Sequence, residues 1–171
     1  HSDDDRDHAK THNQEHKAAI AGPAGLLLGA PERSFAAQDL VLPEAERLAD
    51  DLFLIRYDPR EANVVAQTSS AGVLLVDGGS ARSADRLMQV IGRLPGTGQV
   101  ETLFNTHWHP EQTGLNERLG MGGTTIIAHE NTRLWLTTDV TWPWNGQRFK
   151  RLPKIAQPSK TFYTNGKLDS G

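Results

Sequence analysis

Residues 105–114 read Asn-Thr-His-Trp-His-Pro-Glu-Gln-Thr-Gly and follow directly on a short apolar run, residues 100–105. That run has the pattern of a β-strand, so the segment is expected to begin at the end of a strand. Alternate side chains of an extended segment point to the same side, which predicts one face made of His107, His109 and Glu111. Pro110 favours extended backbone at the preceding residue.

The shared face carries the ligand types that zinc prefers, two imidazoles and a carboxylate. His107 and His109 can share one ion. Four extended residues rise about 13 Å, whereas ligand atoms lie about 2 Å from zinc. Glu111 can therefore reach the same ion only if the chain turns, and we interpret it as a ligand of a second ion or as the catalytic group that orients an attacking water.

The alternative is that His107 and His109 are accidental surface residues. Of the seven histidines, four lie within the first 16 residues. Two of the remaining three fall in this segment, beside an acid and at the end of a strand, where α/β sheets place ligand sites. This distribution favours a metal site.

Regular patterns surround the segment. Strands alternate with helices, which predicts an α/β fold with crossover connections. A serine, Ser80 or Ser83, is expected to cap the first helix, and Pro95-Gly96 to end it. After residue 136 the pattern fades. The predicted strands are residues 52–57, 63–68, 72–77, 100–105 and 124–128, and the predicted helices are residues 84–94, 113–119 and 130–136.

Three stretches together resemble the metallo-β-lactamase-fold superfamily, whose signature is His-x-His-x-Asp, often followed by His. They are residues 105–114, residues 74–79 (Leu-Leu-Val-Asp-Gly-Gly) and residues 126–132 (Ile-Ile-Ala-His-Glu-Asn-Thr). The resemblance covers residues 47 to 165. It implies the N-terminal half of an αβ/βα metallo-β-lactamase-type sandwich and a zinc-dependent hydrolase. It also implies that Asp77 supports the metal loop without binding the ion.

Two positions depart from the signature. Glu111 replaces the Asp, and Gln112 stands where many members have a His for a second ion. A neutral amide is a poor ligand, so Gln112 is assigned a supporting contact and one zinc is favoured over two.

The resemblance also implies a third His some tens of residues downstream, then a bridging Asp and a last His. After His109 the sequence contains only His129. We therefore expect the site to be completed by a segment absent from this chain, either a second polypeptide or a homo-oligomer partner. Three interpretations remain open: the chain is a fragment, a natural split protein, or a catalytically degenerate member that acts as a binding or assembly module.

Composition limits the other possibilities. The 171 residues carry a net charge of −3 without a basic run, which argues against a nucleic-acid partner. The hydrolase that the resemblance implies would act on a small-molecule substrate. Cysteine is absent, which excludes thiolate sites. No apolar run is long enough to span a membrane. Residues 18–30 loosely resemble the apolar part of an export signal, so a periplasmic or secreted protein is favoured and a cytoplasmic one left open.

The domain organisation follows from the same patterns. Residues 1–45 are interpreted as a polar, His-rich tail with an Ala/Gly/Pro-rich lead-in, and residues 46–171 as the metallo-β-lactamase-like domain. His129, with Glu130, is interpreted as a structural residue before a helix rather than a catalytic pair. Trp135, Trp142 and Trp144 have two open interpretations, as the wall of a substrate cleft or as packing.

Overall fold

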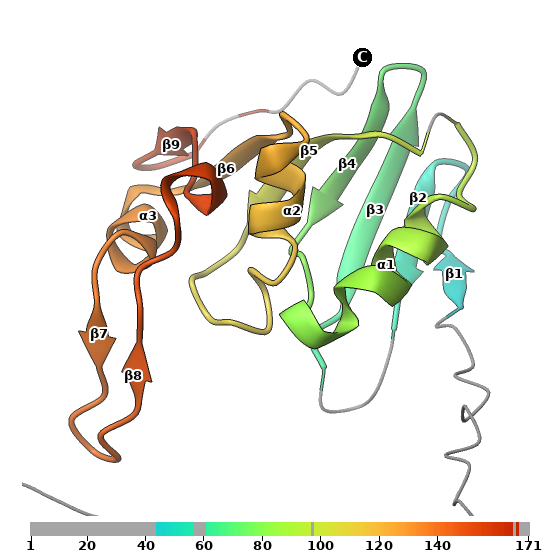
Figure 1. The fold of residues 1–171 in the computed structure, drawn as a ribbon. Coiled ribbons are helices and arrows are strands. Elements are labelled where there is room, and N and C mark those ends of the chain that lie inside the picture. Colours follow the sequence, from blue (N-terminus) through green and yellow to red (C-terminus); the bar gives the residue numbers. More distant parts are fainter. Residues whose placement is uncertain (1–43, 57–60, 97, 166, 168–171) are drawn as a thin grey trace, which may run out of the picture. The chain divides into compact units, whose positions relative to one another are not determined.

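The strands form one mixed sheet in the computed structural model, which describes residues 44–56, 61–96, 98–165 and 167 (Figure 1). The strand order is β1-β2-β3-β4-β5-β6-β9. The strands from β1 to β4 pair antiparallel, and β5, β6 and β9 continue the sheet in parallel. The bounds are β1 (Ala45–Arg47), β2 (Leu52–Ile55), β3 (Val64–Ser69), β4 (Gly72–Val76), β5 (Val100–Asn105), β6 (Thr125–His129) and β9 (Lys160–Phe162).

Helical crossovers connect the parallel strands, as the alternation in the sequence predicts. A 3-10 turn, η1 (Ala81–Ser83), and helix α1 (Ala84–Ile91) link β4 to β5. Helix α2 (Asn116–Met121) links β5 to β6. The last crossover contains helix α3 (Glu130–Leu136), the two-stranded hairpin β7 (Val140–Thr141) and β8 (Arg148–Phe149), and the 3-10 turn η2 (Lys154–Ala156).

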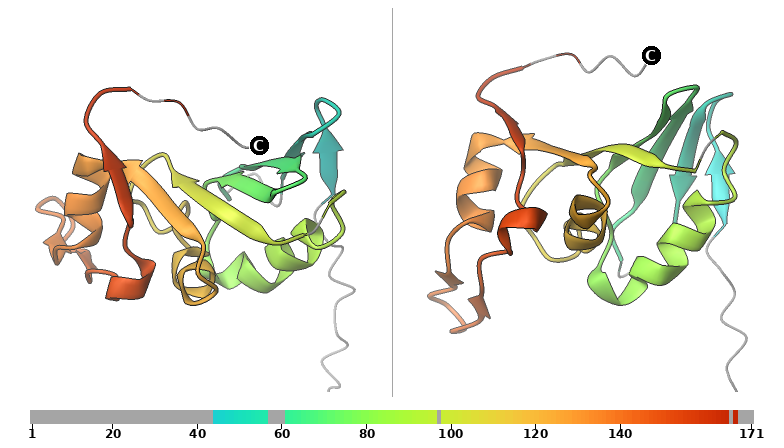
Figure 2. Two further views of the ribbon diagram at one scale, coloured as in Figure 1. Left: turned by 90° about the horizontal axis from the view of Figure 1, so that it is seen from above. Right: turned by 45° about the horizontal axis from the view of Figure 1, so that its top comes forward.

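The core lies on the face of the sheet that α1 and α2 cover, and Figure 2 shows both helices on the same side. The buried strand residues of this face are aligned from strand to strand by the pairing register. Burial of the apolar side chains of this core supplies the main stabilising free energy of the domain. The aligned residues are Phe53, Ala66, Leu75, Leu103 and Ile126.

The other face of the sheet carries a second aligned apolar row. Its members are paired across five neighbouring strands, and the first four are only half-buried. Strands with both faces apolar are typical of sheets that are covered on both sides. The row consists of Leu54, Val65, Val76, Phe104 and Ile127.

Several expected boundaries are wrong. β2 ends at Ile55, two residues before the predicted end, and the tail histidines lie outside the described residues. Neither Ser80 nor Ser83 caps its helix with its side chain. Ser83 is drawn instead toward the Glu61 carboxylate, with Oγ to Oε1 at 3.3 Å. Helix α1 ends at Ile91, with Gly92 as its C-cap, three residues before the predicted end at residue 94.

Short elements account for the remaining differences. The predicted helix 113–119 is α2, which begins three residues later and ends two residues later than predicted. β1 begins at Ala45, one residue inside the predicted lead-in. β7, β8 and β9 were not expected, because strands of two or three residues show no alternation. Among the described residues, no helix is both long and apolar enough to cross a bilayer.

Candidate metal centre

Two loops at the carboxyl ends of β4 and β5 meet and build the site. Gly78 N–H donates to the Gln112 carbonyl at 2.6 Å, and Gly114 N–H donates to the Gly79 carbonyl at 2.7 Å. The approach is so close that a Cβ on Gly114 would lie 2.2 Å from the Ser80 carbonyl carbon. Only glycine fits there, so the glycine at the end of the quoted segment is required by packing against the β4 loop.

Buried asparagines fix the carboxyl end of β5. The Asn105 and Asn116 side chains exchange two amide hydrogen bonds, of 3.1 and 2.8 Å, and Asn116 Nδ2 also donates to the Ala156 carbonyl at 2.9 Å. The pair therefore links β5, α2 and η2. Sequence reasoning missed this role, although an Asn that ends an apolar strand is itself a signal of a buried polar contact.

Asp77 supports the metal loop through Thr106. Its Oδ1 accepts from Thr106 N–H at 2.8 Å and its Oδ2 from Thr106 Oγ1 at 2.7 Å. Asp77 has a left-handed backbone, with φ at 64°. Burial raises the pKa of the Asp77 carboxyl above its ordinary value of 3.8, and the hydrogen bonds from Thr106 and the charge of His107 hold back part of the rise.

Thr106 in turn orients His107. Its Oγ1 lies 2.9 Å from His107 Nδ1. A hydroxyl has one proton, and Thr106 donates it to Asp77, so Oγ1 accepts the Nδ1 proton of His107. The lone pair of the imidazole is then on Nε2, which is the tautomer that a metal ligand needs. Thr106 is a positioning residue that sequence reasoning did not identify.

The structure brings His107 and His109 together. Their ring centroids lie 4.8 Å apart, and the rings meet edge to face at 75°. The predicted extended path does not continue to Glu111, because residues 110–112 form a turn. The turn brings Glu111 Oε1 to 3.7 Å from His109 Nδ1. This distance is too long for a hydrogen bond.

Gln112 carries a buried acceptor. Its backbone carbonyl is bonded to Gly78, but its side-chain Oε1 is buried and has no hydrogen-bond partner in the part of the chain that the structure describes. An unpaired buried carbonyl oxygen costs about 1–3 kcal/mol. Among the described residues, Gln112 Oε1 is the buried side-chain polar atom found without a hydrogen-bond partner. Such an atom is expected where a further donor or a cation binds.

Aromatic side chains, including some from the β7–β8 hairpin, pack against His109. The chain's four tryptophans all belong to this aromatic cluster, together with Phe149. The His109 ring contacts both Trp108 and Trp142, with centroid distances of 4.8 and 5.8 Å. Trp108 also stacks on Trp135 of α3 at 5.4 Å.

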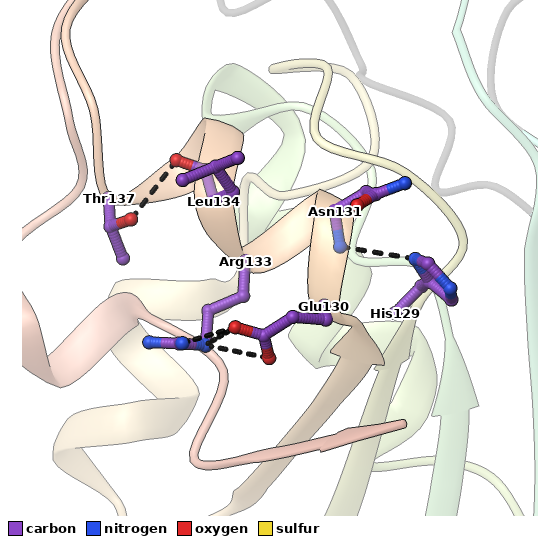
Figure 3. Close-up of polar contacts among 6 residues, drawn as sticks. All are labelled: His129, Glu130, Asn131, Arg133, Leu134 and Thr137. Atoms are coloured by element: carbon purple, nitrogen blue, oxygen red, sulfur yellow. Dashed lines mark hydrogen bonds and ion pairs between the residues drawn. The ribbon is translucent and has the colours of Figure 1, made fainter. Parts of the chain in front are cut away.

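His129 is the N-cap of α3, and its contacts belong to the frame of the fold (Figure 3). Its Nδ1 accepts from Asn131 N–H at 3.1 Å and caps α3, while its Nε2 lies 2.9 Å from the Tyr163 carbonyl. Glu130 is paired with Arg133 of the same helix. Hydrogen bonds from Arg133 and Thr161 lower the pKa of Glu130. Both nitrogens of His129 are used, which agrees with a structural role.

Within residues 44–56, 61–96, 98–165 and 167, no group of three or more His, Asp or Glu side chains is arranged to hold a metal ion. The tautomer of His107 and the closeness of the two imidazoles fit two ligands of a zinc ion. A catalytic zinc takes three protein ligands. The described residues therefore supply a partial ligand set.

Comparison with known proteins gives the fold. No protein-family profile matches the chain, and no curated protein is significantly similar to it. MEM-A1, a subclass B3 metallo-β-lactamase from a soil metagenome library, superposes with a TM-score of 0.57 and 22% identity, over 70% of this chain and 46% of that one. BJP-1, a subclass B3 metallo-β-lactamase of Bradyrhizobium japonicum, superposes with a TM-score of 0.62 and 18% identity, over 78% and 51% of the two chains.

The chain has the metallo-β-lactamase fold. A third match, a metallo-β-lactamase from Cronobacter sakazakii described by the motif HARLDQ, has a TM-score of 0.62 and 16% identity over 75% of this chain and 51% of that one. The chain spans about half the length of these metallo-β-lactamases. The predicted fold class, an α/β fold that forms the N-terminal half of an αβ/βα metallo-β-lactamase-type sandwich, is confirmed.

Proposed function

We propose that this chain supplies the His107/His109 half of the active site of a zinc-dependent hydrolase. The observation that carries the proposal is the chain of contacts Asp77–Thr106–His107, which leaves Nε2 of His107 free as a ligand while His109 lies beside it. The metallo-β-lactamase fold supports a metallo-hydrolase, and the chemistry of two imidazoles supports zinc.

In this proposal His107 and His109 bind one zinc ion. The ion would lower the pKa of a bound water toward neutrality and polarise the scissile bond of an ester, lactam, thioester or similar small substrate. Asp77 and Thr106 hold His107 in its ligand tautomer. Glu111 is exposed and lies beside His109, so it can orient the attacking water or bind a second ion.

Gln112 is compatible with a hydrolase. The motif HARLDQ of the Cronobacter sakazakii metallo-β-lactamase shares its first and sixth letters with His107–Gln112, so a protein of this fold with Gln at the sixth place is known. The side-chain Oε1 of Gln112 is a buried acceptor without a partner among the described residues. We assign it a supporting hydrogen bond within the completed site, with one zinc favoured over two.

The missing ligand is proposed to come from a second structural layer, which belongs to a longer form of the protein, to another polypeptide or to a second copy. The apolar row from Leu54 to Ile127 supports this layer, because it is half-buried on the side away from α1 and α2. A sheet face of this kind is unstable in water unless something covers it. Export to the periplasm or beyond remains a prediction.

The competing function is that of a non-catalytic member that acts as a binding or assembly module. The partial ligand set of the described residues favours it, since two histidines alone bind zinc weakly.

Zinc analysis separates the two functions. The purified species that contains this chain, with the further segment or second copy that completes it, is analysed for metal after dialysis against trace zinc, in a background where the tail histidines His1, His8, His12 and His16 are changed to Gln. We expect about one zinc per chain, loss of zinc in His107→Ala, and retention in the control His129→Asn, whose amide can still cap α3. Absence of zinc, or equal zinc in His107→Ala, would leave the binding-module function.

A further inference from the structure

The β7–β8 hairpin presents an exposed aromatic pair beside the metal centre. Trp142 and Trp144 stack with their ring centroids 4.9 Å apart and an interplanar angle of 27°. Trp144 is 72% exposed, among the most exposed large apolar side chains of the described residues. Trp142 is half-buried and contacts Phe149 at 4.7 Å and the His109 ring at 5.8 Å.

The tip of the hairpin is held in a defined conformation. Trp142 N–H donates to the Gln147 carbonyl at 2.9 Å, and Gly146 N–H donates to the Trp142 carbonyl at 2.8 Å. Gln147 N–H donates to Asn145 Oδ1 at 2.9 Å. Gly146 has φ at 70°, which the turn requires. The ordered turn therefore leaves Trp144 largely in water, so that this side chain gains little hydrophobic free energy on folding.

Charge on the hairpin has one prevailing sign. Residues 137–151 include three basic side chains, Arg148, Lys150 and Arg151, and a single acid, Asp139. Asp139 Oδ1 already accepts a hydrogen bond from Arg151 N–H at 2.9 Å. All three basic residues are exposed. The hairpin thus combines stacked indoles with a local positive charge in a chain of net charge −3.

We propose that the Trp142–Trp144 pair is a binding site for a planar aromatic ring that carries an anionic group. Aromatic rings stack favourably on indole, and cationic side chains attract the anion. Since Trp142 touches His109, a ring on the pair lies next to the metal centre. The site would hold the aromatic, non-reacting part of the substrate, and this assignment to a substrate rests on the proposed function. Binding of the ring itself does not.

Indole signals test the proposal in the metal-free protein. The four tryptophans give four indole N–H cross-peaks in a ¹H–¹⁵N spectrum, each assigned by substitution. Phenylacetate is titrated, with cyclohexylacetate as the matched anion without an aromatic ring, phenylacetamide as the matched ring without charge, and cellobiose as a sugar.

We expect phenylacetate to shift the Trp142 and Trp144 signals most, phenylacetamide less, and cyclohexylacetate and cellobiose not at all. Trp144→Ala should weaken phenylacetate binding about two- to tenfold, as the loss of one aromatic pair does. Tyr163→Ala removes a comparably exposed ring elsewhere and should change nothing. Equal shifts with cyclohexylacetate, shifts with cellobiose only, or no shift with any probe would overturn the proposal. Zinc binding by Trp144→Ala, measured in parallel, shows whether the proposed function stands independently.

Discussion

Thr106→Val removes the hydroxyl that connects Asp77 to His107 and keeps the shape of the side chain. Asp77 Oδ2 loses a donor at 2.7 Å, and His107 Nδ1 loses its acceptor at 2.9 Å. Hydrogen bonds to charged groups contribute about 1.5–3 kcal/mol each. Since Asp77 keeps the backbone donor Thr106 N–H, we expect the free energy of unfolding to fall by about 2 kcal/mol.

Zinc affinity should fall more specifically. Loss of a group that orients a metal ligand weakens binding about 10- to 100-fold. The assay is a competition titration against a chromophoric chelator, paired with urea unfolding of the metal-free protein. Thr106→Ser, which keeps the hydroxyl, should restore most of the affinity.

The matched control is Thr124→Val. Thr124 Oγ1 donates to the Val100 carbonyl at 2.7 Å, away from the His pair. This variant should lose about 1 kcal/mol of unfolding free energy and bind zinc like the original protein. If Thr106→Val binds zinc with unchanged affinity, or if Thr106→Ser binds as weakly as Thr106→Val, the orientation of His107 by Thr106 is refuted.

Three further predictions concern the frame of the site. Gly114→Ala should prevent folding or lower the melting temperature sharply, because its Cβ would lie 2.2 Å from the Ser80 carbonyl carbon. The control Gly92→Ala should be tolerated, because the nearest atom to its Cβ would lie at 3.4 Å. Equal melting temperatures of the two variants would contradict this prediction. The pKa of Asp77 in the folded state is raised above 3.8, so the folded state holds the carboxyl proton more tightly than the unfolded state. The protonated Asp77 carboxyl therefore contributes fully to the free energy of unfolding below pH 3.8, and this contribution declines as the pH rises through the folded pKa. Urea midpoints from pH 3 to 7 should therefore show the original protein losing stability relative to Asp77→Asn as the pH rises, and a constant difference would exclude this titration. Val76→Asp should leave the chain folded and reduce its association, measured by analytical ultracentrifugation. The control Leu75→Asp, on the covered face, should unfold the chain. Unchanged association of the Val76→Asp variant would argue against a second layer.

The main elements could be predicted because they are long enough to show their period. β5 was predicted with its exact bounds, and α3 likewise, since an apolar run and an amphipathic stretch each end at clear signals. The hairpin β7–β8 and strand β9 could not be predicted in this way. They are two or three residues long, and their positions are set by tertiary contacts such as the Trp108–Trp142 pair.

The site was predicted in part. The closeness of His107 and His109 follows from their spacing, but the turn at residues 110–112 overrides the extended path that was assumed for Glu111. Thr106 was missed because its role depends on Asp77, which is 29 positions away in the sequence. Contacts of this range are determined by the pairing of β4 with β5, which no local pattern specifies.

Native mass spectrometry of the purified species that contains this chain, after zinc addition, shows whether His107 and His109 form half of a zinc site. We expect one zinc ion for each copy of the chain, in a species heavier than 18.8 kDa because a further segment or a second copy completes the ligand set. A zinc-free monomer of 18.8 kDa in the presence of excess zinc would contradict it.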